Sequence, residues 1–577
     1  MPPTTTPTTN WVYHPRRSPD AAAALARTLD VPLPMAHVMV NRGLADEASA
    51  RRFLEPSIEQ LHDPTLMLDL ELAAQRILAA IANGERIFIQ GDYDVDGITS
   101  TFLLDSVLRD LGTQPEVRIP HRVRDGYGLS IGAVDDAARR GCSLIVTVDC
   151  GITAVEAVAH ARSKGIDVVV TDHHEPKAVL PEAFAIVDPL RPGCPYPFKS
   201  LAGVGVAFKL AERLLRERGG MERAQTYLDA VALGTIADVV PLVGENRVLA
   251  QLGLRRLNQE RRLGIRALAD VAGAGARLIT SGQVAFVLAP RINAAGRMGN
   301  AEQGLRLLQA RELGEAQDLA MSLEDDNRRR RESDEKVLRE AVQMVEREIG
   351  YPECQSILLW SDQWHPGVIG IVASRLVERY HRPAVLVALD GERGRGSGRS
   401  LPHLDLTRVL DACSDLLVAH GGHAFAAGLT VEREHLPELR ARMERLVRER
   451  SQAEHFVPRL LVDAEVRSDE CDLELVDALE RLAPHGLDNP EPLFRLASVL
   501  PKEVREVGDG KHLRVRLPGA GDRTAIGFGL GSQAGEMRAA GPVDLAFAPT
   551  RNEWRGTTEV QLKLKHWRPA TEEPLGS

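Results

Sequence analysis

The sequence predicts a multidomain α/β protein in which two α/β domains, joined by a long helix, precede a small C-terminal β-barrel. Continuous apolar runs alternate with helical segments between about residues 86 and 190, and again from Ser356. This alternation is typical of parallel, doubly wound sheets. A charged, helix-forming stretch with few glycines separates the two regions, and strand-like segments follow the second one. These three patterns together define the fold class.

Length and composition narrow the class of protein further. The 577 residues are too many for one hydrophobic core. The formal charge of −10 argues against nucleic acid binding over the whole surface, but it does not exclude a local basic track. No apolar run approaches the ~18–20 residues that cross a bilayer, and residues 1–9 contain no apolar signal core. The six cysteines are scattered without a CxxC pair, which indicates reduced thiols. We therefore expect a cytoplasmic, monomeric protein that does not contact membranes.

The same patterns divide the chain into six parts. Residues 35–85 have the three- and four-residue apolar spacing of helices, and both ends of the chain have the composition of tails. The predicted parts are an N-terminal tail (1–35), a first α/β domain (36–300), a connecting helix (301–349), a second α/β domain (350–450), a C-terminal β-domain (456–568) and a C-terminal tail (569–577).

Three aspartates at alternate positions, Asp92, Asp94 and Asp96, follow a short apolar run and precede Gly97. Unpaired carboxylates at the end of a buried strand repel one another and lose hydration, so a fold retains them where a cation offsets their charge. Carboxylate oxygens suit Mg²⁺ or Mn²⁺. The other interpretation is a solvated acidic turn, because short motifs of this kind often mislead.

Polar, metal-capable side chains also follow three later apolar runs. These side chains are Asp149, then Asp172 with His173 and His174, and then Asp188. Because open α/β sheets place their ligand sites at the carboxyl ends of the strands, we expect these side chains to meet the first three aspartates. Imidazole nitrogen favours Mn²⁺ or another transition ion over Mg²⁺. A structural histidine is the alternative interpretation.

Asp238 is a further candidate ligand. It is a lone acid in the apolar stretch 231–242, and burial of an unpaired carboxylate requires a partner. A helix cap before Pro241 is the other interpretation of this residue.

Several motifs, taken in order, resemble those of the DHH phosphoesterase family, including its bacterial single-strand exonucleases and its companion DHHA1 domain. The resemblance covers about residues 40–568, and the ordered combination is far more specific than any one motif. The matching stretches are 92–97, 148–151, 172–174, 201–205, 234–242, 290–298, 364–375, 394–400 and 421–428.

The resemblance implies a two-metal hydrolase. Two ions ~4 Å apart activate a water and stabilise both oxygens of an in-line displacement at phosphorus. For His174 two roles stay open, namely orientation of a ligand and donation to the phosphoryl oxygen. The implied ligands of two Mn²⁺ or Mg²⁺ ions are Asp92, Asp94, Asp96, Asp149, His173 and Asp238, and the implied catalytic residues are Asp94, Asp149, His173 and His174.

The resemblance also implies nucleic-acid contacts in the second α/β domain. The glycine-rich, basic stretch 394–399 suits close approach of backbone N–H groups to a phosphate, while taken alone it is equally consistent with a flexible hairpin. Residues 421–423 are expected on the same cleft, or else mark a helix N-terminus packed on a strand. The expected DNA-binding residues are Arg122, Arg291, Ser397, Arg399 and His423.

Two further features concern nucleic acid. The arginine run 328–331 is either a solvated face with acidic neighbours, which we favour, or a stripe that contacts phosphates. Residues 500–568 contain 12 Lys/Arg against 8 Asp/Glu. This basic, strand-rich region predicts an OB-fold that follows single strands, with Trp554 or Trp567 as stacking platforms unless they belong to the core.

The expected function is a metal-dependent exonuclease that degrades single-stranded DNA 5′→3′ to 5′-mononucleotides in recombination and repair, with a single-strand-binding protein and a helicase as partners. A hole between the two α/β domains would exclude duplex DNA sterically. One alternative is a DHH phosphodiesterase acting on short oligoribonucleotides or cyclic dinucleotides, which needs neither a long helix nor a β-barrel. A DNA-binding scaffold without ions is the other, and the clustered acids argue against it.

Overall fold

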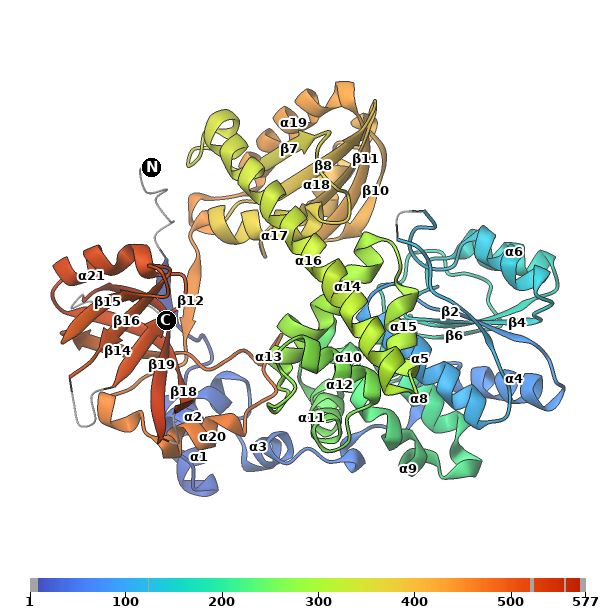
Figure 1. Ribbon diagram of the computed structural model, residues 1–577, viewed down its shortest axis with the longest axis horizontal. Coiled ribbons are helices and arrows are strands. Elements are labelled where there is room, and N and C mark those ends of the chain that lie inside the picture. Colours follow the sequence, from blue (N-terminus) through green and yellow to red (C-terminus); the bar gives the residue numbers. More distant parts are fainter. Residues whose placement is uncertain (1–8, 123, 519–522, 555–556, 571–577) are drawn as a thin grey trace.

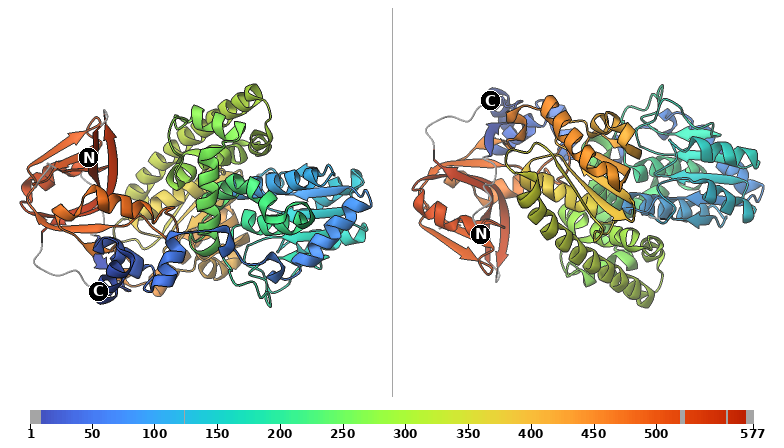
Figure 2. Two further views of the ribbon diagram at one scale, coloured as in Figure 1. Left: turned by 90° about the horizontal axis from the view of Figure 1, so that it is seen from below. Right: turned by 90° about the horizontal axis from the view of Figure 1, so that it is seen from above.

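A computed structural model of the chain describes residues 9–122, 124–518, 523–554 and 557–570. Three bodies surround a long central helix, α16 (Leu313–Met344) (Figure 1). The first α/β domain and the C-terminal β-domain lie at opposite ends of the molecule, as the views from below and above also show (Figure 2). Among the described residues, no helix combines the length and the hydropathy of a membrane-spanning segment.

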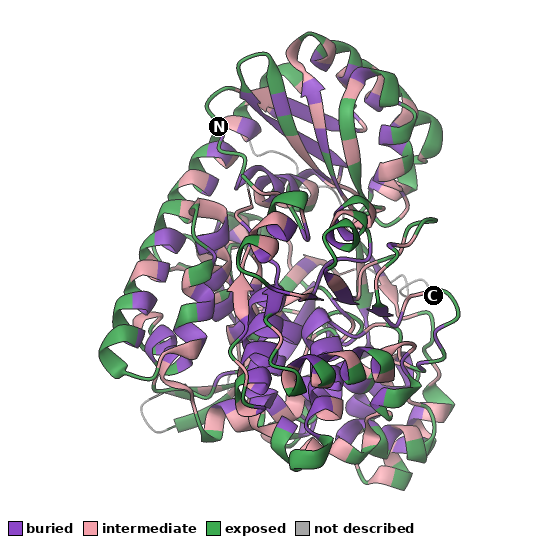
Figure 3. Ribbon diagram, turned by 90° about the vertical axis from the view of Figure 1, so that its right-hand side faces the viewer, coloured by how far each residue is buried: buried purple, intermediate pink, exposed green. Residues whose placement is uncertain are grey.

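The first α/β domain is built on a five-stranded parallel sheet in the order β3-β2-β4-β5-β6. All four predicted apolar runs form strands in it. Helices cover both faces of the sheet, which is why β2, β4, β5 and β6 are largely apolar rather than alternating (Figure 3). The edge strand β3 is half-buried and carries Glu116 and Arg118. The strands are β2 (Ile87–Gln90), β3 (Glu116–Arg118), β4 (Leu144–Val148), β5 (Asp167–Thr171) and β6 (Ala185–Val187). The covering helices are α4 (Leu70–Ala82), α5 (Val95–Asp110) and α8 (Gly203–Leu214) on one face, and α6 (Ile131–Arg139) and α7 (Val155–Ser163) on the other.

A helical layer extends this domain toward α16. Its helices are α10 (Leu228–Ala237), α11 (Gly244–Gln259), α12 (Leu263–Val271), α13 (Ser281–Gln283), the π-helix η5 (Val284–Leu288), α14 (Ala289–Met298) and α15 (Glu302–Gln309). The predicted connecting helix 301–349 is therefore not one helix. Ala310 leaves the helical conformation with ψ 129°, and α16 begins three residues later and continues into the π-helix η6 (Val345–Ile349).

The second α/β domain has a five-stranded mixed sheet in the order β10-β11-β9-β8-β7. Its strands are β7 (Ile357–Ser361), β8 (Ala384–Asp390), β9 (Arg393–Arg399), β10 (Leu417–His423) and β11 (Ala426–Glu432), and its helices are α17 (Ile369–Tyr380), α18 (Leu406–Asp411) and α19 (Leu436–Arg450).

The glycine-rich stretch 394–399 is a central strand, β9, rather than a loop or a hairpin tip. It pairs antiparallel with both β8 and β11, so its backbone N–H groups belong to the sheet. Its glycines face the domain core at alternate positions, where side chains pack directly on the strand; a Cβ on Gly396 would lie 2.7 Å from Leu429 Cδ1. Any phosphate contact from β9 must therefore come from its side chains.

The C-terminal β-domain has a seven-stranded sheet in the order β13-β14-β18-β19-β17-β16-β15. Helix α20 (Leu473–Glu480) packs against it. Its strands are β13 (Ala464–Glu465), β14 (Phe494–Val499), β15 (Glu503–Val507), β16 (His512–Arg516), β17 (Thr524–Gly527), β18 (Val543–Trp554) and β19 (Thr557–Pro569).

The predicted N-terminal tail is wrong for residues 10–35. Strand β1 (Asn10–Tyr13) pairs with β12 (Arg459–Val462), and α1 (Pro19–Leu29) and α2 (Leu33–Asn41) share one hydrophobic core with the C-terminal β-domain. Helix α3 (Glu47–Leu54) completes this core. The sequence cue for a tail came from residues 1–8, which lie outside the described part of the chain, as do residues 571–577 of the predicted C-terminal tail.

Candidate active site

The turn between β2 and α5 positions the first three aspartates. Asp94 caps α5, because its carboxylate accepts a hydrogen bond of 3.0 Å from the Gly97 backbone N–H. Asp92 precedes the cap and Asp96 lies in the first helical turn, so the positive end of the helix dipole faces all three acids. Gly97 is required for this tight turn, since a Cβ there would lie 2.6 Å from the Asp92 Cβ.

Asp149 lies directly after β4 in a strained turn. Its φ is 59°, a left-handed conformation that few residues other than glycine adopt, and Gly151 follows with φ 115°. The turn directs the Asp149 carboxylate toward the amino end of α8, where a Cβ on Gly203 would lie 2.4 Å from Asp149 Oδ1. The backbone is therefore strained at Asp149, a candidate metal ligand.

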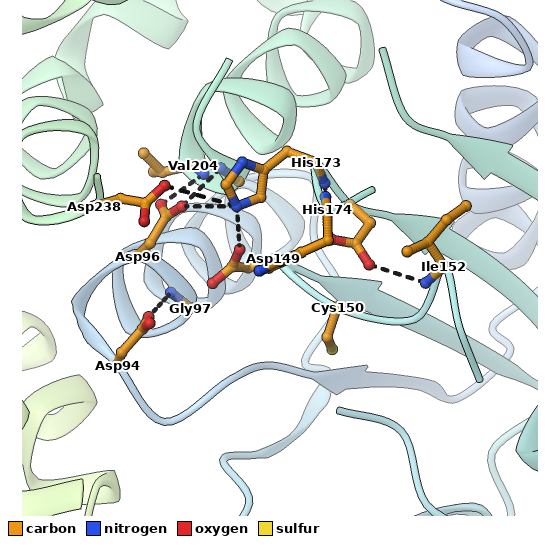
Figure 4. Close-up of polar contacts among 12 residues, drawn as sticks. Asp94, Asp96, Gly97, Asp149, Cys150, Ile152, His173, His174, Val204 and Asp238 are labelled. Atoms are coloured by element: carbon orange, nitrogen blue, oxygen red, sulfur yellow. Dashed lines mark hydrogen bonds and ion pairs between the residues drawn. The ribbon is translucent and has the colours of Figure 1, made fainter. Parts of the chain in front are cut away.

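His173 lies at the centre of the cluster (Figure 4). Its Nε2 lies 3.1 Å from a carboxylate oxygen of Asp149, 3.7 Å from one of Asp238 and 3.8 Å from one of Asp96. Asp238 ends α10 as its C-cap residue, so the cap interpretation and the ligand interpretation both apply to it. Acids from three segments, widely separated in the sequence, therefore meet around the imidazole of a fourth.

Asp172 holds the histidine pair in place. It is fully buried and accepts hydrogen bonds from the backbone N–H groups of Ile152, His173 and His174, and its Oδ1 lies 2.7 Å from His174 Nδ1. Burial lowers the pKa of His174, but the bond to Asp172 outweighs it and raises this pKa to about 9. His174 therefore carries a positive charge at neutral pH and faces the cluster.

The acids of the cluster are poised for a cation. Burial, and then the charges of neighbouring acids, raise the pKa of Asp94 and Asp149, and raise that of Asp96 to about 7. Buried oxygens of Asp92, Asp149 and Asp238 have no hydrogen-bond partner among the described residues. Three groups bring one ligand atom from each member within 4.8 Å of the others: Asp92, Asp94 and Asp149; Asp96, His173 and Asp238; and Asp149, His173 and His174. These overlapping groups fit the oxygen-rich ligand set of paired divalent ions.

Three arginines, Arg122, Arg297 and Arg399, form a cluster where the two α/β domains meet, and Arg297 donates to the Gly367 carbonyl across this contact. Burial, and then the charge of Arg122, lower the pKa of Arg399, and the same two causes with Arg330 lower the pKa of Arg297 to about 10. Arg399 donates to Ser397 Oγ at 3.2 Å, and both side chains face the amino end of α17 at Gly370. Arg122, Arg297 and Arg399 are half-buried, and their mutual repulsion fits an anionic ligand.

Models of three families match separate parts of the chain. The DHH family N-terminal domain matches residues 86–235, the DHHA1 domain matches 333–449, and the RecJ OB domain matches 462–566. The chain is 38% identical to the single-stranded-DNA-specific exonuclease RecJ of Bacillus subtilis over 95% of its own length and 70% of that protein. It is 36% identical to the protein of the same name from Escherichia coli over 89% of this chain and 93% of that one. The chain belongs to the RecJ family.

A solved structure supports the same assignment. The crystal structure of RecJ from Thermus thermophilus in complex with Mn²⁺ superposes with a TM-score of 0.84 at 32% identity, covering 98% of this chain and 80% of that one. The complex of the same protein with Mg²⁺ gives a TM-score of 0.78. The predicted resemblance, the fold class and the metal-binding character of the site are thereby confirmed.

The remaining predicted residues are distributed unevenly around the RecJ fold. Arg291 is buried, with its Nε 2.5 Å from Glu324 and its Nη1 donating to the Val287 carbonyl. The structure therefore does not bring Arg291 into the cluster of Arg122, Arg297 and Arg399. His423 lies on the edge strand β10, in the same cross-strand row as Ala426 and Arg399. Two strand spacings, about 10 Å, separate His423 from Arg399.

Of the two interpretations of Trp567, the structure supports the core residue and not the stacking platform. This side chain is buried in the core of the OB domain, and its indole N–H donates to Gln533. The side chain of Trp554 lies outside the described residues.

Sequence reasoning missed three residues of the site. Arg297 lies in the motif 290–298, six residues beyond the predicted Arg291, and donates a hydrogen bond to the Gly367 carbonyl in the second α/β domain. Tyr127 donates to the Asp149 carbonyl and lies 3.0 Å from His174 Nδ1. Asp172 was recognised as a strand-end acid but was not given a role. Arg291 and Arg297 lie on different faces of α14, a difference that helical periodicity could have revealed. No pattern in the sequence indicates that Tyr127 contacts Asp149.

Gly203→Ala is expected to disable the metal site without unfolding the domain. The added Cβ would lie 2.4 Å from Asp149 Oδ1, so the carboxylate must move away from His173. Calorimetric titration with Mn²⁺ should show at least about a tenfold loss of affinity, comparable to other changes that displace a ligand. Gly535→Ala, at a helical glycine with no atom within 4 Å of the added Cβ, is the matched control. Equal Mn²⁺ affinity in the two variants would contradict the expected crowding.

Proposed function

We propose that the chain is a divalent-metal-dependent exonuclease that degrades single-stranded DNA from its 5′ end and releases 5′-mononucleotides, in recombination and repair. One observation carries this proposal: a cluster of acids and imidazole fit for paired cations lies in the same molecule as a cluster of three half-buried arginines. The similar RecJ proteins are named single-stranded-DNA-specific exonucleases, and a similar structure is a complex with Mn²⁺.

The side chains divide the work of a phosphodiester hydrolysis. Asp92, Asp94, Asp96, Asp149, His173 and Asp238 would hold two Mn²⁺ or Mg²⁺ ions, which when bound lower the pKa of a coordinated water and neutralise charge on the phosphate. His174 is held by Asp172 through Nδ1, so its Nε2–H would donate a hydrogen bond to a phosphoryl oxygen. Asp172 thus acts through His174 rather than on the substrate.

The arginine cluster would set the direction of digestion. A terminal phosphate carries more negative charge than an internal phosphodiester and presents more free oxygens, so Arg122, Arg297 and Arg399 would prefer a strand end. Arg297 belongs to α14 and Arg399 to β9, so the cluster requires the two α/β domains to stay in contact. A strand end held there would present a nearby phosphodiester bond to the acids.

Arg399→Ala is expected to remove the preference for a 5′-phosphate. With Mn²⁺ and a single strand labelled within its 5′-terminal nucleotide, the unaltered protein should release labelled mononucleotide and leave a blunt duplex undigested. The variant should lose about 10- to 100-fold in kcat/KM on 5′-phosphorylated strands, as for loss of a charge-assisted hydrogen bond, and much less on 5′-hydroxyl strands. Arg408→Ala, on the exposed surface of the same domain, is the control. Digestion from the 3′ end, or of duplex at the same rate, would refute the proposed function.

We place this activity in the cytoplasm, where chromosomal single strands arise. A strand-specific exonuclease needs an unpaired end, which a helicase generates and a single-strand-binding protein keeps unpaired. Both are therefore the partners that we propose for the chain.

A further inference from the structure

Phe286, on the π-helix η5, exposes a large apolar side chain to solvent, which is energetically unfavourable. It is 81% exposed, although its neighbours Val284 and Leu288 on the π-helix η5 are fully buried. The π-helix fixes this outward orientation, and single π-turns of this kind are frequent at functional sites. A large aromatic ring held in water by a rigid turn is suited to stacking on a flat ligand.

Phe286 separates two cavities. A groove of about 1130 Å³ runs between the first α/β domain and the OB domain, and includes Leu278 and Pro549 with Phe286 in its lining. A smaller cavity of about 260 Å³ lies between Phe286, α16 and α17. Figure 1 shows α13, which leads directly into η5, on the side of the helical layer that faces the OB domain. Phe286 therefore lines both the groove that faces the OB domain and the cavity that faces α16 and α17.

The smaller cavity contains arginines that are free to bind a ligand. In the run 328–331, Arg328, Arg329 and Arg330 each pair with an aspartate of α16, whereas Arg331 has no ion pair or hydrogen bond among the described residues. Arg375 of α17 lines the same cavity and has no ion pair or hydrogen bond in the described chain, although burial raises the pKa of Asp334 and the charge of Arg375 is one of those that oppose this rise. The acids of this cavity are Asp334, which Arg330 neutralises, and Glu335, which lies 3.9 Å from Arg339.

The helix that follows Phe286 leads to the metal ligands. Phe286 and Pro290 line the small cavity together, and Asn293, one further turn along, accepts a hydrogen bond from the backbone N–H of Val95 beside Asp94. Seven residues separate Phe286 from Asn293, about 10 Å at the rise of a helix. Phe286 therefore lies about two helical turns from the residue that contacts the turn of Asp94.

We propose that Phe286 stacks on a base of the substrate strand while Arg331 and Arg375 hold an adjacent phosphate, so that these residues set the minimum length of strand that binds well. The proposal rests on the proposed function and adds a nucleotide subsite to it. It also divides the arginine run: Arg328 faces solvent, as the sequence favoured, and Arg331 contacts phosphate. A flat aromatic surface tolerates every base, which suits an enzyme that must digest any sequence.

Phe286→Ala tests the stacking contact. On a 20-nucleotide strand with Mn²⁺, KM should rise about tenfold or more, as for loss of one stacked base, while kcat/KM on a 5′-phosphorylated dinucleotide stays unchanged. Phe286→Trp should retain the affinity of the unaltered protein, and Phe286→Leu should not. In EDTA, where nothing is cleaved, 2-aminopurine placed at successive positions of the strand should be quenched at one internal position only, and Phe286→Ala should abolish that quenching.

A matched pair of arginine variants tests the phosphate contact. Arg331→Ala should weaken strand binding and reduce the slope of log affinity against log salt concentration by about 0.7, the value for one single-strand phosphate contact. Arg328→Ala, in the same run on the same helix, should change neither quantity.

Failure of the subsite is distinguishable from failure of the proposed function. An unaltered protein that digests no strand refutes the function. An unaltered protein that digests the strand, with Phe286→Ala or Phe286→Leu equal to it on the 20-nucleotide strand, overturns the subsite. Equal loss on the dinucleotide and on the long strand would also overturn it, because Phe286 would then act on the metal centre.

Discussion

Asp149→Asn is expected to lower nucleotide release about 1,000-fold, since the loss of a metal-bound charge removes several kcal/mol of transition-state stabilisation. Asp149 belongs to two of the three groups that can hold an ion, and its Oδ1 lies 3.1 Å from His173. An asparagine keeps the size of the side chain but removes the charge that both ions would share. The measurement is single-turnover release from a labelled strand with Mn²⁺ in excess.

Stability should change in the opposite direction. In the metal-free protein, burial and the charges of Asp96 and Asp94 raise the pKa of Asp149, so its ionised form destabilises the fold. Asp149→Asn removes that repulsion, and the melting temperature without metal should rise, by about 2–4 °C for each kcal/mol gained. Asp167→Asn, at the opposite end of β5 and paired with Arg76, is the control and should keep full activity. Activity within tenfold of the unaltered protein, or a lowered metal-free melting temperature, would contradict the assigned role.

The metal site was predictable because topology fixes it. Once 144–148, 167–171 and 185–187 are recognised as parallel strands, their carboxyl ends must meet at one edge, and Asp149 and His173 are brought together by pairing of β4 with β5. Asp238 comes from a helix end instead. It was found only because a lone acid in an apolar stretch needs a partner.

Residues whose role depends on packing between domains were less predictable. Arg291 and Arg297 lie in one motif but on different faces of α14. As a result, Arg291 pairs with Glu324, whereas Arg297 donates to the Gly367 carbonyl. The strand β9 was hidden by its glycines, which predict turns when only local preference is considered. Packing against β8 and β11 overrides that preference.

The N-terminal helices illustrate the same limit over a longer range. Helix α1 is short and rich in alanine, and nothing in its own sequence indicates a partner more than 400 residues away. Its buried residues Ala22 and Leu25 join the core of the OB domain, whose strands complete that core. Contacts of such sequence separation follow from the whole fold rather than from local pattern.

The metal-free protein is expected to lose stability as the pH rises from 6.5 to 8.5, and divalent metal should reverse this trend. Burial and neighbouring acids raise the pKa of Asp96 and of Asp188 to about 7 in the folded state. The unfolded chain has released these protons by pH 6.5, whereas the folded protein still holds part of them. Stability therefore falls with pH, by about 1 kcal/mol for each carboxyl across this window.

Other groups do not reverse the sign in this window. The raised pKa values of His173 and His174 act in the same direction, because the folded protein holds these protons after the unfolded chain has lost them. Carboxyls with lowered pKa, such as Glu71 at about 2, are ionised in both states above pH 6.5. His485, whose pKa burial lowers to about 4, affects stability chiefly below this window.

Divalent metal should invert the slope, because deprotonated carboxylates bind it and protons no longer compete. Each ion at about 1,000 times its Kd adds about 4 kcal/mol, so the difference in melting temperature with and without Mg²⁺ should widen steadily toward pH 8.5. Thermal melts in EDTA and in Mg²⁺, measured in parallel for Asp96→Asn, provide the comparison. The variant should show a flatter metal-free profile and a smaller metal effect. A metal-free stability that rises with pH would show that the acids are already neutralised by the protein itself.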